Sequence, residues 1–92
     1  IGNVNIFNNS VIISHDNKVG NANFFAPGFT SSGKVEIGQF NFFGSRSVIS
    51  NVRTVGSHNI ICIGTVVTKN ITDHLSIIGN PMQILSTKVE LQ

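Results

Sequence analysis

Apolar residues recur at every sixth position of the chain, beginning at Ile1 and ending at Val67. Only Ser31 interrupts the series, and each member is followed by a small or compact residue. The series is Ile1, Phe7, Ile13, Val19, Phe25, Ser31, Ile37, Phe43, Ile49, Val55, Ile61 and Val67. Neither a helix, with 3.6 residues per turn, nor simple strand alternation produces this spacing, whereas short strands separated by tight turns do. The pattern therefore predicts an all-β protein.

A longer repeat of eighteen residues, or three hexapeptides, lies on top of the first. Its markers are Ile1-Gly2, Val19-Gly20, Ile37-Gly38 and Val55-Gly56. Three hexapeptides per repeat indicate a three-sided coil in which residue n lies beneath residue n+18, one strand spacing of about 4.8 Å away. A β-sandwich is the alternative, but its loops vary in length and would break the register. We predict a parallel β-helix of about four coils over residues 1–72, followed by a final strand and a C-terminal tail over residues 73–92.

Side chains alternate along a strand, so the residue before each inward position points outward. Aligned at eighteen residues, these outward positions form three stripes. The stripes are Ile6, Phe24, Phe42 and Ile60; Ile12, Thr30, Val48 and Val66; and Lys18, Glu36, Thr54 and Thr72. The third stripe is polar, with Lys18 and Glu36 placed to pair. The first is wholly apolar and should be covered by a second subunit, by the tail or by a preceding segment, of which we favour a subunit interface.

Composition and charge narrow the possible partners. A chain of 92 residues is one small domain with a marginal core, so help from a partner subunit is expected. Charged residues make up 11% of the chain, and the net charge of +2 is scattered, which argues against a nucleic-acid partner. The apolar runs are too short for a membrane span, and no leader pattern begins the chain. We expect a soluble, cytoplasmic protein, and the single Cys62 rules out an internal disulfide.

The third residue of each hexapeptide falls in a turn, and there the pattern places His15 beside Asp16. His15, Gly33, Asn51 and Lys69 then share one corner over roughly 14 Å, three strand spacings. An imidazole can take a proton from an attacking group, and a glycine lets its backbone N–H approach a developing oxyanion. We predict that Gly33, Asn51 and Lys69 bind an extended thioester cofactor. A solvated His-Asp pair and a solvated lysine are the alternatives.

The motif "SVIISHDNKVG", followed one coil later by "SSGKVEIG" and near the end by "IGTVVTKNI" and "GNP", resembles the hexapeptide-repeat acyltransferases. The similarity is to the branch of sialic-acid O-acetyltransferases and amino-sugar N-acetyltransferases. This resemblance implies a left-handed β-helix and a homotrimer with active sites between subunits. It also implies acetyl-CoA as co-substrate and a sugar or nucleotide-sugar as acceptor.

The resemblance implies roles for four residues. His15 matches the general base of the branch, and Asp16 matches the carboxylate that orients and polarises it. Gly33 matches the glycine whose N–H binds the acetyl carbonyl, and Asn8 matches an asparagine close to the acceptor amine or hydroxyl.

The sequence also departs from the family. Relatives often have a second histidine near the cofactor, where this chain has Phe24. The usual "IGAGSVV" reads "ICIGTVV", with Cys62 and Ile63 in place of small residues, and "GNPA" reads "GNPMQ". The N-terminal α/β segment that helps relatives to hold the sugar has no counterpart in this sequence.

We expect an acetyl-CoA-dependent acetyltransferase that acts on an amine or hydroxyl of a sugar or nucleotide-sugar in a ternary complex. One alternative is a zinc hydratase on the same fold, which needs three converging histidines. His15 and His58 do not stack in the predicted register and His74 lies beyond the regular coils, so we expect no metal. The other alternative is a non-catalytic β-helical fragment or module that binds partners through its apolar face.

Overall fold

The computed structural model describes residues 1–86, which form thirteen short strands and no helix. The strands are β1 (Ile6–Phe7), β2 (Ile12–Ile13), β3 (Lys18–Val19), β4 (Phe24–Phe25), β5 (Thr30–Ser31), β6 (Glu36–Ile37), β7 (Phe42–Phe43), β8 (Val48–Ile49), β9 (Thr54–Val55), β10 (Ile60–Ile61), β11 (Val66–Val67), β12 (Ser76–Ile78) and β13 (Gln83–Ser86). Strands β1 to β11 recur every six residues, as the hydrophobic pattern predicts. The last six residues of the predicted C-terminal tail lie outside the described part.

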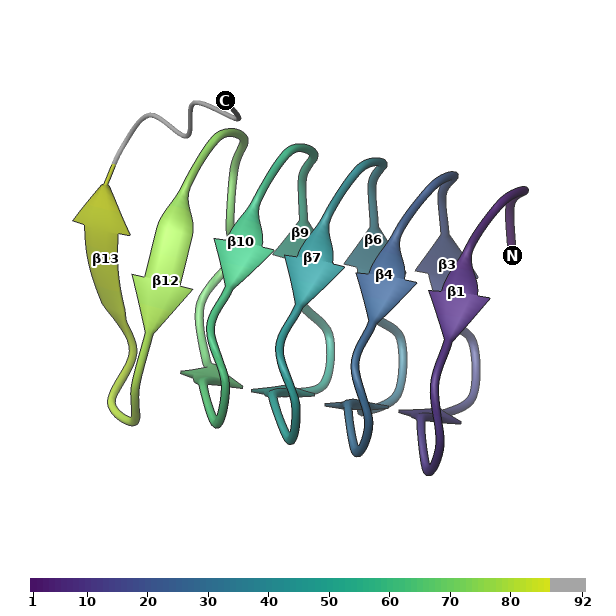
Figure 1. Cartoon of the computed structure of the whole chain (residues 1–92), viewed down its shortest axis with the longest axis horizontal. Coiled ribbons are helices and arrows are strands. Elements are labelled where there is room, and N and C mark those ends of the chain that lie inside the picture. The colour runs from purple at the N-terminus through teal and green to yellow at the C-terminus, as the bar shows by residue number, and fades with distance from the viewer. Residues whose placement is uncertain (87–92) are drawn as a thin grey trace.

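Every third strand pairs in parallel, so the molecule is a three-sided coil. The three sheets have the orders β1-β4-β7-β10-β12-β13, β11-β8-β5-β2 and β3-β6-β9. Ile6 pairs with Phe24, Ile12 with Thr30 and Lys18 with Glu36, each eighteen residues apart. In Figure 1 the chain descends through β1, β4, β7 and β10, rises behind through β3, β6 and β9, and advances from right to left, which is a left-handed coil. The predicted β-helix is confirmed.

The eighteen-residue register ends in the last coil. Val55 bridges to Ile71 and Ile60 pairs with Ser76, both sixteen residues away. This side of the coil is therefore two residues shorter, and Thr72 does not continue the stripe of Lys18, Glu36 and Thr54 as predicted. Strand β13 then turns back and pairs antiparallel with β12.

The inward positions of the six-residue pattern form the core. Those from Val19 to Val67 are all buried, and they include Ser31. The rings of Phe7, Phe25 and Phe43 stack one per coil, at centroid distances of 4.8 and 5.0 Å, and Phe29 packs against the last two. Phe7 is 41% exposed, since within residues 1–86 only the coil of Phe25 packs against it.

A column of asparagines, buried from Asn23 onward, links successive coils at one corner, and the six-residue pattern does not predict it. The Oδ1 atoms of Asn5, Asn23, Asn41 and Asn59 accept hydrogen bonds from the backbone N–H groups of Asn23, Asn41, Asn59 and Leu75 respectively, at 2.8–3.0 Å. Their Nδ2 groups donate to carbonyl groups in the turn before the next coil's asparagine. Buried polar groups that are fully paired specify one alignment of neighbouring chains, so this column fixes the coil register.

The first outer face is apolar, and the third is polar from Lys18 to Thr54, as predicted. On the first, Ile6 and Phe42 are exposed by 54% and 43%, and the rings of Phe24 and Phe42 stack at 5.1 Å. On the third, Lys18 and Glu36 are neighbours in register, but within residues 1–86 they form no ion pair. The apolar first face is thus available for a partner, while the third faces solvent.

We predict that Asn41→Ala destabilises the protein by about 2–5 kcal/mol, because it leaves the Asn59 N–H and the Gly56 carbonyl without their partners in the interior. Urea denaturation measures the change. The matched control is Asn9→Ala. Asn9 lies in an exposed turn, and its side chain forms no hydrogen bond within residues 1–86, so this substitution should change stability by less than about 0.5 kcal/mol. Equal effects of the two substitutions would show that the asparagine column does not hold the coils together.

Candidate active site

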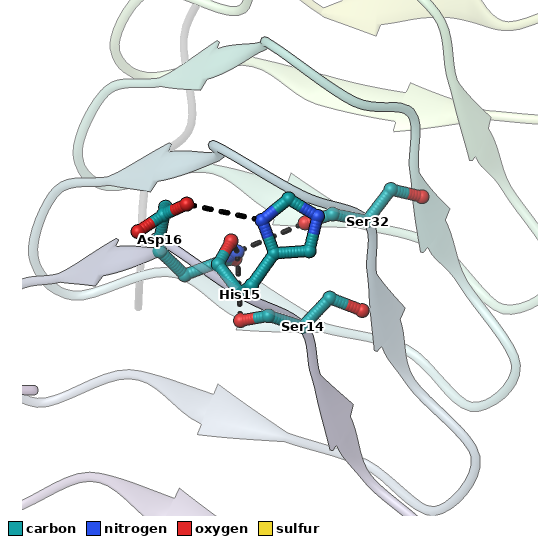
Figure 2. A network of polar contacts seen from close by, with 5 residues as sticks. Ser14, His15, Asp16 and Ser32 are labelled. Carbon is teal, nitrogen blue, oxygen red and sulfur yellow. Dashed lines mark hydrogen bonds and ion pairs between the residues drawn. The ribbon is translucent and has the colours of Figure 1, made fainter.

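His15 and Asp16 form the turn between β2 and β3, and both side chains project into solvent. Asp16 takes a φ of 57°, in the left-handed region that the turn requires. Its Oδ2 lies 3.1 Å from the Nδ1 of His15, with side-chain exposures of 74% for the histidine and 72% for the aspartate. A carboxylate at Nδ1 favours the tautomer with the proton on that nitrogen, which leaves Nε2 free to accept one. In Figure 2 Asp16 lies at one edge of the imidazole, while the side chains of Ser14 and Ser32 extend on its other side.

Gly33 lies directly beside this imidazole, one coil along the axis. A Cβ atom at position 33 would lie 2.5 Å from both Cε1 and Nε2 of His15, so only glycine leaves room for the ring in this position. The backbone N–H of Lys34 donates to the carbonyl of His15 at 3.0 Å and locks the two turns together. The N–H of Gly33 itself forms no hydrogen bond within residues 1–86. Within residues 1–86 this corner therefore carries a backbone N–H without a partner, at Gly33, in the turn beside the His15 ring.

Asn17 holds the turn that carries His15, a role that the sequence pattern did not reveal. Its Nδ2 group lies 3.1, 3.0 and 2.9 Å from the carbonyl oxygens of Ser14, His15 and Ser32. Its Oδ1 is buried and has no partner within residues 1–86. The amide thus ties the backbone on both sides of His15 to the next coil, which limits how far the imidazole can move.

Asn51 and Lys69 are the other two residues of the predicted column. Asn51 lies next along the corner, because the N–H of Val52 donates to the carbonyl of Gly33 at 3.0 Å. Beyond Asn51 the turn changes: Asn70 lacks the positive φ found at Lys34 and Val52, and its Oδ1 instead accepts from the N–H of Thr54. The coil is two residues shorter between Val67 and Ile71, so a place for Lys69 in this column stays a prediction.

Lys34 is the cation that the structure does place on this corner. It follows Gly33, is exposed, and occupies the same turn position as Asp16 one coil earlier. The sequence contains a signal for it, since Lys34 lies eighteen residues after Asp16, at the fourth position of the hexapeptide rather than the third, where the predicted column lies.

Asn8 lies at a different corner from His15. The strand β2 separates the two residues, and the Nδ2 of Asn8 donates to the carbonyl of Phe25 at 3.0 Å. Within one chain the structure does not bring Asn8 and His15 together, so a role for Asn8 beside the acceptor stays a prediction.

The other two histidines belong to a third corner. His58 and His74 stack face to face with ring centroids 4.9 Å apart, which corrects the expectation that His74 lies beyond the coils. The three histidines therefore do not converge as a zinc hydratase requires. In the described part of the chain no group of three His, Cys, Asp or Glu side chains could hold a metal ion, and no helix could cross a membrane.

We predict that Gly33→Ala displaces the imidazole of His15 while the protein stays folded, because the added Cβ meets a flexible side chain and the φ of Gly33 is not in the left-handed region. The NMR signals of the His15 ring should shift in this variant, with thermal stability nearly unchanged. Gly44→Ala is the contrast, because its Cβ would lie 2.6 Å from the backbone nitrogen of Ile63 and should cost stability. Unaltered His15 signals in Gly33→Ala would show that the ring does not lie over Gly33.

Solved structures that share this fold include sugar acyltransferases. Perosamine N-acetyltransferase from Caulobacter crescentus, in complex with CoA and GDP-perosamine, matches with a TM-score of 0.88 and 26% identity over 94% of this chain and 41% of its own. The UDP-N-acetylglucosamine acyltransferase of Campylobacter jejuni matches with a TM-score of 0.91 and 28% identity over 94% of this chain and 34% of its own.

A maltose O-acetyltransferase from Clostridium difficile shares the fold at a TM-score of 0.75 and 20% identity, over 97% of this chain and 59% of its own. No family model and no curated protein matches the sequence. The chain spans less than half the length of the first two structures. The predicted resemblance is thus confirmed by structure: the chain is a hexapeptide-repeat β-helix whose structural neighbours are sugar acyltransferases.

Proposed function

We propose that this chain forms the β-helical part of an acetyl-CoA-dependent acetyltransferase that acts on a sugar or nucleotide-sugar. The observation that carries the proposal is the pairing of the His15 imidazole, held by Asp16, with the unbonded N–H of Gly33 at the same corner. Support also comes from the two neighbours of 26–28% identity, of which one is a perosamine N-acetyltransferase bound to CoA and GDP-perosamine.

The reaction we propose is direct acyl transfer in a ternary complex. The acceptor amine or hydroxyl attacks the thioester carbonyl carbon while the Nε2 of His15 removes its proton, as a positioned general base does. The carbonyl oxygen gains negative charge, which the N–H of Gly33 stabilises by a hydrogen bond. The carbon–sulfur bond then breaks and CoA leaves as its thiolate, which takes the proton from the imidazolium. The acetyl group ends on the acceptor, and His15 returns to its starting state.

Asp16 acts throughout on the imidazole rather than on the substrates. Its carboxylate at Nδ1 fixes the ring orientation and stabilises the imidazolium that forms when Nε2 takes the proton. Asn17 holds the turn in place because its Nδ2 group lies within hydrogen-bond distance of three backbone carbonyl oxygens. Lys34 and Asn51, further along the same corner, are exposed and suited to bind the polar parts of CoA.

We also propose that the active protein is a homotrimer assembled through the apolar first face. That face carries Ile6, Phe24, Phe42 and Ile60, of which Ile6 and Phe42 are more than 40% exposed. A row of large apolar side chains across successive coils is costly to leave in water, so a second copy of the chain is its natural cover. The non-catalytic module remains the competing function, since the same face would serve it equally well.

His15→Ala should lower kcat/KM for acetyl transfer by at least about a hundredfold, the low end for a positioned general base. His74→Ala, which removes an exposed histidine from another corner, should leave the rate within about twofold if this corner alone contains the base. The assay is transfer from acetyl-CoA to an amino-sugar nucleotide. Wild-type activity in His15→Ala would rule out this base. If the wild-type protein neither reacts nor gains thermal stability with CoA, the non-catalytic module is favoured.

Phe42→Glu should convert the trimer into monomers, because it places a charge in the centre of the buried apolar face. Sedimentation velocity measures the change. The matched control is Thr54→Glu, which adds the same charge to the exposed third face and should leave the oligomer intact. A wild-type chain that sediments as a monomer, or an oligomer that survives Phe42→Glu, would contradict the proposed interface.

A further inference from the structure

A ladder of flat rings runs along the corner that follows β3, β6 and β9. Phe40, His58 and His74 occupy the same turn position in successive coils, with φ values of 58°, 60° and 59°. The centroids of Phe40 and His58 are 5.1 Å apart and those of His58 and His74 are 4.9 Å apart, with the ring planes within 18° and 7° of parallel. Each coil thus contributes one ring to a continuous stack.

The ladder stops at Ala22, which leaves one face of Phe40 without a neighbour. Ala22 occupies the same turn position one coil earlier, as the backbone bonds from Ala22 to Asn3 and from Phe40 to Asn21 show. Phe40 remains 55% exposed although His58 covers its other face. The next residue in the column is Val4, two coil spacings or about 10 Å from Phe40. Between them lies room for one more ring, because alanine contributes only a methyl group.

A cation and a groove lie on the third face, and the lining of the groove ends at Gly20 and Gly38, two residues before Ala22 and Phe40. A cavity of about 450 Å³ follows the third face and is lined by the residues from Lys18 to Gly20 and their counterparts one and two coils on. Lys18 lies on the strand that leads directly to Ala22, and it forms no ion pair in the described part of the chain. Glu36 lies one coil further along, at the level of Phe40. Its negative charge disfavours an anion at that level, so an anion is favoured at the level of Ala22, beside Lys18.

We infer that this corner binds a nucleotide, with the nucleobase stacked on the free face of Phe40 above Ala22 and a phosphate in the groove beside Lys18. A nucleobase has the planar shape that continues the ladder, and base–aromatic stacking tolerates any base because every base has a π face. The groove runs along the third face, which joins this corner to the corner of His15. Either the adenine of CoA or the base of a nucleotide-sugar could supply this chemistry, and the choice of probe distinguishes them.

Binding is measured by calorimetric titration with CoA, GDP and UDP, and with ribose 5-phosphate as the probe that lacks a base. Phe40→Ala should weaken nucleotide binding about 5- to 150-fold, the range for loss of one stacked base. Ala22→Phe should abolish it while thermal stability is kept or raised, because the new ring fills the vacancy at a φ of 57° that Phe40 already adopts. Ser10→Phe places the same ring at the equivalent turn position of another corner and should leave binding unchanged.

The source of the base follows from which probe responds. Loss of CoA binding alone in Ala22→Phe assigns the site to adenine, loss of GDP or UDP binding alone assigns it to a nucleotide-sugar, and loss of all three supports a site that accepts the base of either. These titrations contain no acetyl donor, so the site is tested even if the proposed acetyl transfer is absent. The inference is overturned if ribose 5-phosphate binds as well as the nucleotides, if neither Phe40→Ala nor Ala22→Phe changes their binding, or if Phe40→Ala alters the sedimentation coefficient, which would mean that another protein chain covers the ring.

Discussion

The alignment of each coil on the next is the constraint on which every other feature depends. Parallel strands only two residues long offer little pairing on their own, so the turns must carry the register. They do so through backbone bonds between successive corners, such as Lys34 to His15, and through the buried amides of Asn23 and Asn41. A one-residue slip would turn the apolar interior outward and leave those amides without partners. One alignment is therefore far more stable than its neighbours.

The same alignment turns a linear repeat into corners with distinct chemistry. At one corner it places a histidine and its carboxylate against a glycine with a free N–H; at another it stacks an aromatic ring and two imidazoles. Neither arrangement needs a helix or a long loop. Side chains at the turns project into solvent from a rigid interior, so the fold can vary its binding groups without altering its core.

The sequence alone predicted the strands, the inward residues and the contact between His15 and Gly33, because the six-residue spacing is unbroken from Ile1 to Val67. It misplaced Thr72 in the polar stripe, because the coil is two residues shorter between Val67 and Ile71, where the six-residue series ends. Asn17 and the asparagine column act through side-chain hydrogen bonds to carbonyl groups. Hydrophobic spacing indicates which residues are buried but not which hydrogen bonds they form, so the hydrogen bonds of these asparagines could not be predicted from it.

The most direct test of the central claim, that coil alignment assembles an acyl-transfer site at the corner of His15, is a crystal structure with a non-hydrolysable acetyl-CoA analogue. The account predicts the carbonyl oxygen of the analogue about 2.7–3.2 Å from the Gly33 nitrogen, with the carbonyl carbon facing the Nε2 side of His15. An analogue bound at another corner, or a Gly33 N–H directed away from the bound carbonyl, would contradict it.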